Sequence, residues 1–182
     1  MAKGRSIDPL SDPLDAWIRM TLPRALGYAR ALLRDAVTAE DVVQDCYARL
    51  IGRADRYDLP RDGLKILLRS VSNACIDRRA RERVLLSLDG GPDDPTSEVV
   101  DRQSPDPPQE AIAREMAGRI EQALAKLPVG QRAAIHLSGL GYTLPEVAEL
   151  LGTTHGNARV LVHRARKTLE VDLGPFLFGD QS

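Results

Sequence analysis

Arginine is the residue type in this chain whose density and spacing point most directly to chemistry. Arg78, Arg79, Arg81 and Arg83 place four guanidinium groups within six residues, near the end of a predicted helix. Long side chains with a permanent positive charge suit contacts with the phosphates of nucleic acid. Cations also compensate the negative end of a helix dipole, so the cluster alone leaves both interpretations open.

A second group of polar residues belongs to a predicted helix-turn-helix motif. Thr143 and Glu146 have the spacing of a capping box, Gly152 suits the tight turn, and Thr154 can cap the following helix. Crossed helices that bind no DNA can show the same spacing, so that alternative also stays open. The outward positions of the second helix, which can reach base edges in a major groove, are Asn157, Arg159, Val160, His163, Arg164, Arg166 and Lys167.

An acidic and amide face forms the third candidate surface. Asp41, Gln44 and Asp45 fall on one side of another predicted helix. Such a face can dock a basic partner, although charged helix faces are most often only solvated. The sequence therefore offers this face as a binding surface without excluding the second interpretation.

Helical periodicity positions these three groups, because apolar residues recur every three or four positions in several segments. Ser11, Asp12 and Pro13 predict the start of the first helix, and Pro23 should kink it or split it in two. Thr38 is the predicted cap of the second helix. The other predicted helices span about 62–84, 109–126 and 131–137, and the helix-turn-helix motif follows them.

Charge is distributed unevenly along the chain. The formal net charge is only −1, from 25 basic and 26 acidic residues. Residues 84–110, however, contain one basic and seven acidic side chains, and this part of the chain is rich in proline. Proline disfavours helix at the residue before it, so residues 85–108 are predicted to be a flexible acidic linker. The sequence thus predicts two small helical domains on either side of a linker.

Composition narrows the class of protein. Aromatic residues make up only 4% of the 182, which disfavours an all-β fold and favours an all-α one. Cys46 and Cys75 are too few for a disulfide scaffold or a cysteine-rich zinc site, and we expect them to be small buried thiols. The sequence starts without the apolar stretch of a signal peptide, and no apolar run is long enough to span a membrane. We therefore expect a cytoplasmic protein without membrane insertion.

Catalytic chemistry has no recognisable signature in the sequence. We find no glycine-rich phosphate loop, no cluster of metal ligands and no nucleophile–base pair. The prediction is therefore a protein that is not an enzyme, with no catalytic residue, no bound metal and no cofactor.

Three blocks in a fixed order carry a family resemblance over about residues 14–170. They are residues 39–45, residues 71–79, and Leu127-Pro128 followed by the helix-turn-helix motif that ends at 163–167. In this order, and joined by an acidic linker, they resemble a group IV sigma factor of bacterial RNA polymerase, the extracytoplasmic function (ECF) type. The resemblance implies region two at 10–84, a linker at 85–108 and region four at 109–170; the tail, 171–182, has no counterpart that we can place.

The resemblance also implies roles for the candidate residues. Region two would hold the β′ clamp helices of core RNA polymerase, and region four would meet the β flap. Asn73 would contribute to a pocket for a flipped base of the −10 element of promoter DNA, and an anti-sigma factor is a possible further partner. The implied polymerase-binding residues are Asp41, Gln44 and Asp45; those for the −10 element are Asn73, Asp77, Arg78, Arg79, Arg81 and Arg83; those for the −35 element are Thr154, His155, Asn157, Arg159, Val160, His163, Arg164 and Lys167.

Two other functions remain alternatives. A helix-turn-helix regulator that works without core polymerase would have no use for the Asp41, Gln44 and Asp45 face. A sigma mimic that only titrates an anti-sigma partner would not need Arg159 or Arg164. Substitutions at these two surfaces therefore separate the three functions.

Overall fold

The computed structural model describes residues 13–88 and 108–177, and every regular element in these two ranges is helical. This confirms the predicted all-α fold. None of the described helices combines the length and the apolar character that crossing a bilayer requires. The elements are α1 (Pro13–Leu33), α2 (Ala36–Ile51), the 3-10 helix η1 (Ala54–Arg56), α3 (Leu59–Leu88), α4 (Pro108–Ala125), α5 (Val129–Gly139), α6 (Leu144–Leu150) and α7 (His155–Leu177).

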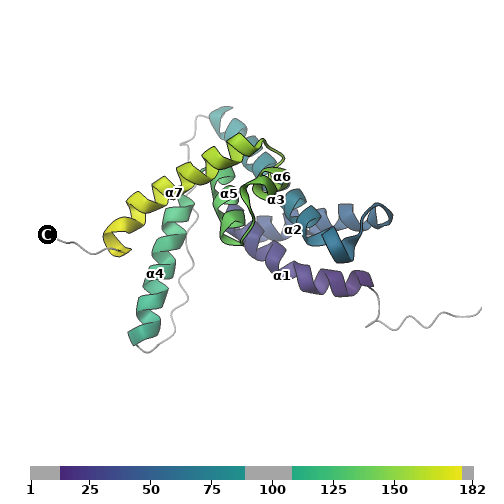
Figure 1. Cartoon of the computed structure of the whole chain (residues 1–182), viewed down its shortest axis with the longest axis horizontal. Helices are drawn as coiled ribbons and strands as arrows, with labels where there is room; N and C mark the ends of the chain where they lie inside the picture. The colour runs from purple at the N-terminus through teal and green to yellow at the C-terminus, as the bar shows by residue number, and fades with distance from the viewer. Residues whose placement is uncertain (1–12, 89–107, 178–182) are drawn as a thin grey trace, which may run out of the picture.

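Helices α1, α2 and α3 pack together as the first unit (Figure 1). Leu67, Leu68 and Val71, in the middle of α3, are at most 2% exposed. The hydroxyls of Tyr28 and Ser72 are also buried and lie 2.9 Å apart in a hydrogen bond. Burial raises the pKa of Tyr28 well above its usual value, so this phenol stays neutral. An apolar core with paired hydroxyls thus holds α1 against α3.

The N-cap of α2 is Asp35 and not Thr38. The Asp35 carboxylate accepts a hydrogen bond from the backbone N–H of Thr38 at 2.8 Å. Hydrogen bonds from Thr38 lower the pKa of this carboxyl. The predicted cap was wrong because Asp35 stands three residues before Thr38, where its carboxylate reaches a free N–H of the first turn. The helix therefore starts earlier and takes in Ala36 and Val37.

Pro23 does not split α1, which runs as one helix from Pro13 to Leu33. Proline leaves the carbonyl four residues before it without its helical partner. Pro23 and Arg19 are both exposed, so this carbonyl lies on the side of α1 that faces water. The predicted split was wrong because water can hydrogen-bond to the Arg19 carbonyl, which lacks a backbone donor at Pro23.

Gly63 of α3 packs directly against the indole of Trp17 in α1. A Cβ built on Gly63 would lie 2.3 Å from Nε1 of Trp17, and this indole is only 2% exposed. Trp17 also meets Tyr47 of α2 edge to face, with ring centroids 5.2 Å apart. Glycine is therefore required for close approach at this crossing, where three helices meet.

We expect Gly63→Ala to lower the free energy of unfolding by about 1–3 kcal/mol, as overpacking of a filled core does. Urea denaturation followed by fluorescence is the measurement, since Trp17 is the one tryptophan of the chain. The control is Gly118→Ala in α4, where a Cβ would meet nothing within 4 Å. That change should be neutral or stabilising, because alanine is the better helix former. Equal effects at both glycines would contradict the assignment.

The second unit contains the predicted helix-turn-helix motif, formed by α6 and α7. The carboxylate of Glu146 accepts hydrogen bonds from the Thr143 N–H at 2.9 Å and from its hydroxyl at 2.8 Å. Gly152 has φ of +62°, the left-handed conformation that the turn requires. Val147 and Ala148 are buried against α7. The motif is therefore confirmed as a structure, together with its cap and its glycine.

Helices α3 and α7 extend beyond their predicted ends. Helix α3 continues through Leu88, so residues 85–88 at the start of the predicted linker are helical. Most of that linker, residues 89–107, lies outside the described residues. Helix α7 continues to Leu177, where its last turns lie against α4. There the guanidinium of Arg119 lies 3.8 Å above the ring of Phe176. Residues 171–177 of the tail thus complete a contact with α4.

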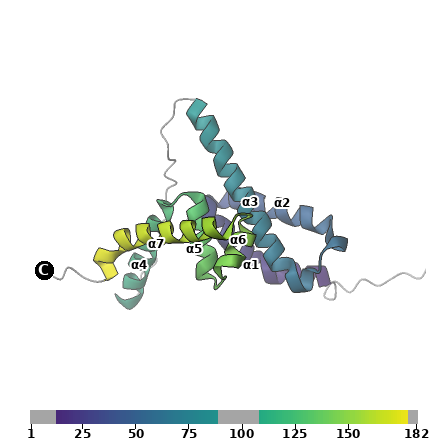
Figure 2. The ribbon, with the colours of Figure 1, turned by 45° about the horizontal axis from the view of Figure 1, so that its top comes forward.

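The two units are packed against each other. Figures 1 and 2 both show α5 beside α1 and α6 beside α3, and these pairs are in contact. The buried core is continuous from Leu32 of α1 to Ala133 and Leu137 of α5. The sequence predicts two domains joined by a flexible linker, and it does not predict this contact between them.

Candidate nucleic-acid interface

Helix α7 turns one face inward and one face to solvent. Ala158, Val162 and Ala165 are at most 4% exposed and pack on the rest of the second unit. Small side chains at these positions hold α7 close to α5 and α6. The opposite face is fully accessible and consists of His155, Asn157, Arg159, Val160, His163, Arg164 and Lys167, all of which are exposed.

The start of α7 is held by hydrogen bonds of its own. The Thr154 hydroxyl accepts from the Asn157 backbone N–H at 3.2 Å, as the predicted cap requires. The Asn157 side-chain amide donates to the Thr153 hydroxyl at 2.8 Å. The polar groups at this end are therefore oriented before any ligand arrives. A rigid, cationic helix face of this kind can enter a major groove.

The arginine cluster of α3 is divided by its contacts. Arg78 and Arg79 both pair with Glu82, at 3.3 and 3.2 Å. Arg79 also donates to the backbone carbonyl of Leu33 and thus serves the C-terminus of α1. Arg81 and Arg83 are exposed. Because α3 continues to Leu88, the cluster is not at the end of its own helix; Arg79 compensates the end of α1 instead, and Arg81 and Arg83 are the most accessible cations.

Asn73 and Asp77 lie one turn apart on α3, and both are exposed. Arg81 donates to the backbone carbonyl of Asp77 at 3.3 Å. Gly152 in the helix-turn-helix motif approaches this part of α3. A Cβ built on Gly152 would lie 3.8 Å from Oδ1 of Asn73. The structure thus brings the candidate base-pocket residue next to the turn of the other unit.

The predicted acidic face of α2 exists and faces water. Asp41, Gln44 and Asp45 are all exposed, whereas Val43 and Cys46 on the other side of α2 are fully buried. Among residues 13–88 and 108–177, no cation pairs with either carboxylate of this face. Its charge is therefore available to a partner.

The two cysteines are buried thiols, as expected. Cys46 and Cys75 are both free and 0% exposed. Burial raises the pKa of Cys46, and it raises the pKa of Cys75 to about 12. Neither thiol is thus a reactive thiolate at neutral pH. In the part of the chain that the structure describes, no group of three or more potential ligands gathers around a metal position.

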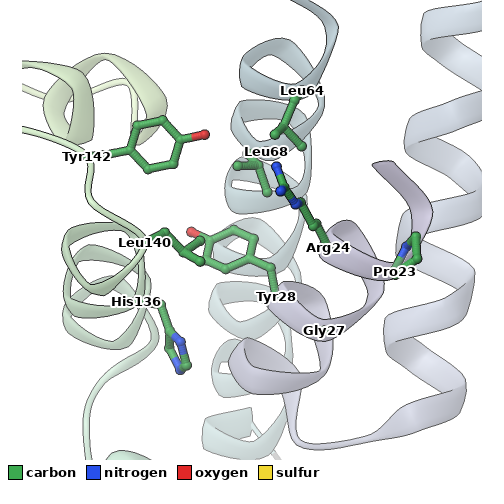
Figure 3. A pocket seen from close by; sticks show the side chains of 9 residues that line it. All are labelled: Pro23, Arg24, Gly27, Tyr28, Leu64, Leu68, His136, Leu140 and Tyr142. Atoms are coloured by element: carbon green, nitrogen blue, oxygen red, sulfur yellow. The ribbon is translucent and has the colours of Figure 1, made fainter. Parts of the chain in front are cut away.

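A pocket of about 400 Å³ opens at the junction of the two units (Figure 3). Arg24 and Tyr28 reach it from α1, Leu68 from α3, and His136 and Tyr142 from the second unit. Protein interiors are normally packed without voids of this size. The junction is therefore not completely filled by side chains.

Arg132 of α5 also lies at this junction, and it belongs to none of the groups of residues that the sequence singles out. It is 6% exposed, and its guanidinium donates to the carbonyls of Leu124 at 2.9 Å, Ala125 at 2.7 Å and Leu127 at 2.8 Å. It also donates across the junction to the carbonyl of Leu32 at 2.9 Å. One buried cation thus serves the ends of α4 and α1. These four acceptors are backbone carbonyls, which no sequence pattern distinguishes.

Comparison with known proteins assigns the chain to a family. The family model described as "Sigma-70 region 2" matches residues 17–84, and that described as "Sigma-70, region 4" matches residues 117–169. The ECF RNA polymerase sigma factor SigM of Mycobacterium tuberculosis is 30% identical over 148 residues, which is 80% of this chain and 69% of that protein. The chain belongs to the ECF sigma factors. The ECF sigma factor SigW of Bacillus subtilis is 28% identical over 148 residues, 78% of this chain and 79% of SigW.

A solved structure shares the fold of this sigma factor. It is that of RpoE in complex with the anti-sigma factor NepR from Bartonella quintana, with a TM-score of 0.65 and 24% identity. The match covers 86% of this chain and 94% of RpoE. Membership of the family makes the protein a sigma factor of transcription initiation, in agreement with the resemblance that the three sequence blocks carry. It leaves the roles of individual residues as predictions.

Proposed function

We propose that this sigma factor binds core RNA polymerase through the face formed by Asp41, Gln44 and Asp45, with the β′ clamp helices as its partner. The observation that carries the proposal is the exposed acidic face of α2, whose opposite side is apolar and buried and whose carboxylates pair with no cation in residues 13–88 and 108–177. Exposed carboxylates without internal partners favour a basic partner and steer its approach. Region four would contact the β flap.

Helix α7 would read the −35 element in the major groove. Its outward face offers Arg159 and Arg164 for bidentate contact with guanine, and Val160 for contact with a thymine methyl group. Val160 is 42% exposed, so its side chain is accessible to a bound DNA. Thr154, His155, Asn157, His163 and Lys167 would complete this face with backbone and groove contacts.

Helix α3 would bind the −10 element and a base flipped out of it. Removing a base from the stack costs a few kcal/mol, and contacts to the edge and face of that base in a pocket offset the cost. Asn73 would hydrogen-bond the base, with Asp77 one turn away. Arg81 and Arg83, and to a smaller extent Arg78 and Arg79, would neutralise phosphates beside it.

Run-off transcription tests the function as a whole. Purified sigma factor and core polymerase would be combined with genomic fragments, and the transcript starts would be mapped. We expect discrete starts that share a −35 and a −10 sequence, and protection and opening of those promoters. Transcripts that are absent, or identical without the sigma factor, would reject the proposal in favour of a regulator that works without polymerase.

Arg164→Ala is expected to weaken binding to the mapped −35 element by about 1–3 kcal/mol and to relax selectivity at one base pair. The measurement is fluorescence anisotropy with the promoter duplex and with duplexes changed at single positions. Arg164 is exposed, so the variant should fold normally. Equal binding of every duplex by both proteins would contradict a reading role and would support a mimic that titrates an anti-sigma partner.

An inhibitory protein partner is the remaining part of the proposal. The structurally similar RpoE is bound to the anti-sigma factor NepR. We infer that this sigma factor, too, is held by an anti-sigma factor. The tagged chain would be purified from its own cells before and after stress, and the co-purifying proteins would be identified by mass spectrometry. The anti-sigma factor is expected to co-purify before stress and to be absent after it.

A further inference from the structure

One face of α3 carries a row of cations that the proposed DNA contacts do not include. Arg61, Lys65 and Arg69 follow one another at intervals of four residues, and Asn73 continues the row. Residues four apart lie on the same side of a helix. All three cations are exposed. Among the described residues, an ion pair forms at only one of them: Nζ of Lys65 lies 2.8 Å from Oε1 of Glu146.

Glu146 comes from the other unit, where it is the capping residue of α6. Helix α6 lies against α3 in the view of Figure 2. The hydrogen bond with Glu146, helped by the charge of Glu149, raises the pKa of Lys65. The same contact with Lys65, together with the hydrogen bonds from Thr143, lowers the pKa of Glu146 to about 2. The acidic side of α6 therefore faces the cationic row of α3.

The contact continues to the candidate base pocket. The turn that follows α6 places Gly152 beside Asn73, where a Cβ on the glycine would be 3.8 Å from Oδ1 of the asparagine. Even a methyl group on Gly152 would already contact Asn73, so a base cannot lie between the two residues. Helix α6 thus approaches the row, and its turn narrows the space at the end of the row.

We propose that Arg61, Lys65 and Arg69 form a phosphate track for single-stranded DNA that leads to Asn73, and that Glu146 and Glu149 occupy this track in the closed arrangement as substitutes for phosphates. The ligand is the sugar–phosphate backbone, which long cationic side chains bind without regard to sequence. The inference rests on the proposed function in one respect, the placing of a base at Asn73.

The spacing of the promoter elements gives the closed contact a consequence. Roughly 25 base pairs separate a −35 from a −10 element, or about 85 Å at 3.4 Å per base pair. In the closed arrangement the turn before α7 lies beside Asn73 instead. Both elements are therefore engaged only after α6 has left the track. Exchange of the Glu146 carboxylate for a phosphate keeps Lys65 paired in both states.

The test is a double-mutant cycle on the full chain with a fluorescein-labelled oligothymidine of about 12 nucleotides, a length in the range of single-strand binding sites. Glu146→Gln removes the charge, and glutamine still suits the third position of a capping box. An exposed ion pair is a weak contact, so we expect this variant to bind about threefold more tightly at low salt. Lys65→Gln should bind about threefold more weakly and show a smaller salt dependence.

The variant that combines Glu146→Gln with Lys65→Gln tests whether Glu146 acts through Lys65. If Glu146 acts by occupying the track, Glu146→Gln should bring no gain once Lys65 is glutamine. Glu121→Gln is the matched control, because Glu121 is exposed on α4 and forms no ion pair with a described residue. An equal gain from Glu121→Gln, or a gain from Glu146→Gln that persists without Lys65, would overturn the proposal. The cycle needs no polymerase, so its failure is distinguishable from failure of run-off transcription.

Discussion

Arg132→Met is expected to lower the free energy of unfolding by about 3–5 kcal/mol, because it leaves several buried carbonyls without a donor and each costs roughly 1–3 kcal/mol. The guanidinium reaches four carbonyls, three in and just after α4 and one at the end of α1. These carbonyls are at the negative ends of two helices, where a cation is favourable. Methionine fills a similar volume, so the loss would come from the hydrogen bonds and not from a cavity.

Urea denaturation followed by circular dichroism measures this effect. Arg132→Lys is the informative companion, since an ammonium keeps the charge but lacks the planar fork that serves four acceptors. We expect its loss to lie between the wild type and the methionine variant. Arg166→Met on the exposed face of α7 is the matched control, with an expected change within about 0.5 kcal/mol. A methionine variant at position 132 as stable as that control would show that backbone carbonyls at the junction are not what Arg132 serves.

The second large effect is expected at the polymerase surface. Asp41→Lys combined with Asp45→Lys should reduce run-off transcription by about 100-fold or more, because like charges placed opposite each other across an interface cost several kcal/mol. Both side chains are exposed and take no part in ion pairs within the described residues. Stability should therefore remain within about 0.5 kcal/mol of the wild type. Binding to core polymerase, measured by co-elution, should be lost together with transcription.

The matched control reverses two carboxylates of the first unit that lie outside α2, Asp15 in α1, which pairs with Arg19, and Asp55 in η1. This variant has the same change of net charge and should transcribe normally. Binding of the −35 duplex by region four should be unchanged in both variants. A chain that transcribes normally with α2 reversed would remove the α2 face from the polymerase interface, and with it the argument that separates a sigma factor from an independent regulator.

Local chemistry is the reason the sequence predicts so much of this fold. The capping box of Thr143 and Glu146 and the left-handed turn at Gly152 were both predicted. Each of these two features depends on residues fewer than four positions away. The outward face of α7 follows from helical periodicity alone. Where two local signals compete, the sequence prediction is less secure: Asp35 and Thr38 are both good caps, and only the observed hydrogen bond separates them.

The packing of the two units required the tertiary structure. Arg132 and Leu32 are 100 residues apart in the chain. Their contact joins a guanidinium to a backbone carbonyl, a group that every residue possesses. Lys65 and Glu146 are separated by 81 residues, and neither belongs to a pattern that identifies the other. Periodicity shows which side of a helix is buried, but not which distant helix covers it. The family, the helices and the exposed faces could therefore be predicted from residue types and spacing. The contact between α3 and α6 could not, because it depends on the packing of surfaces whose residues are far apart in the sequence.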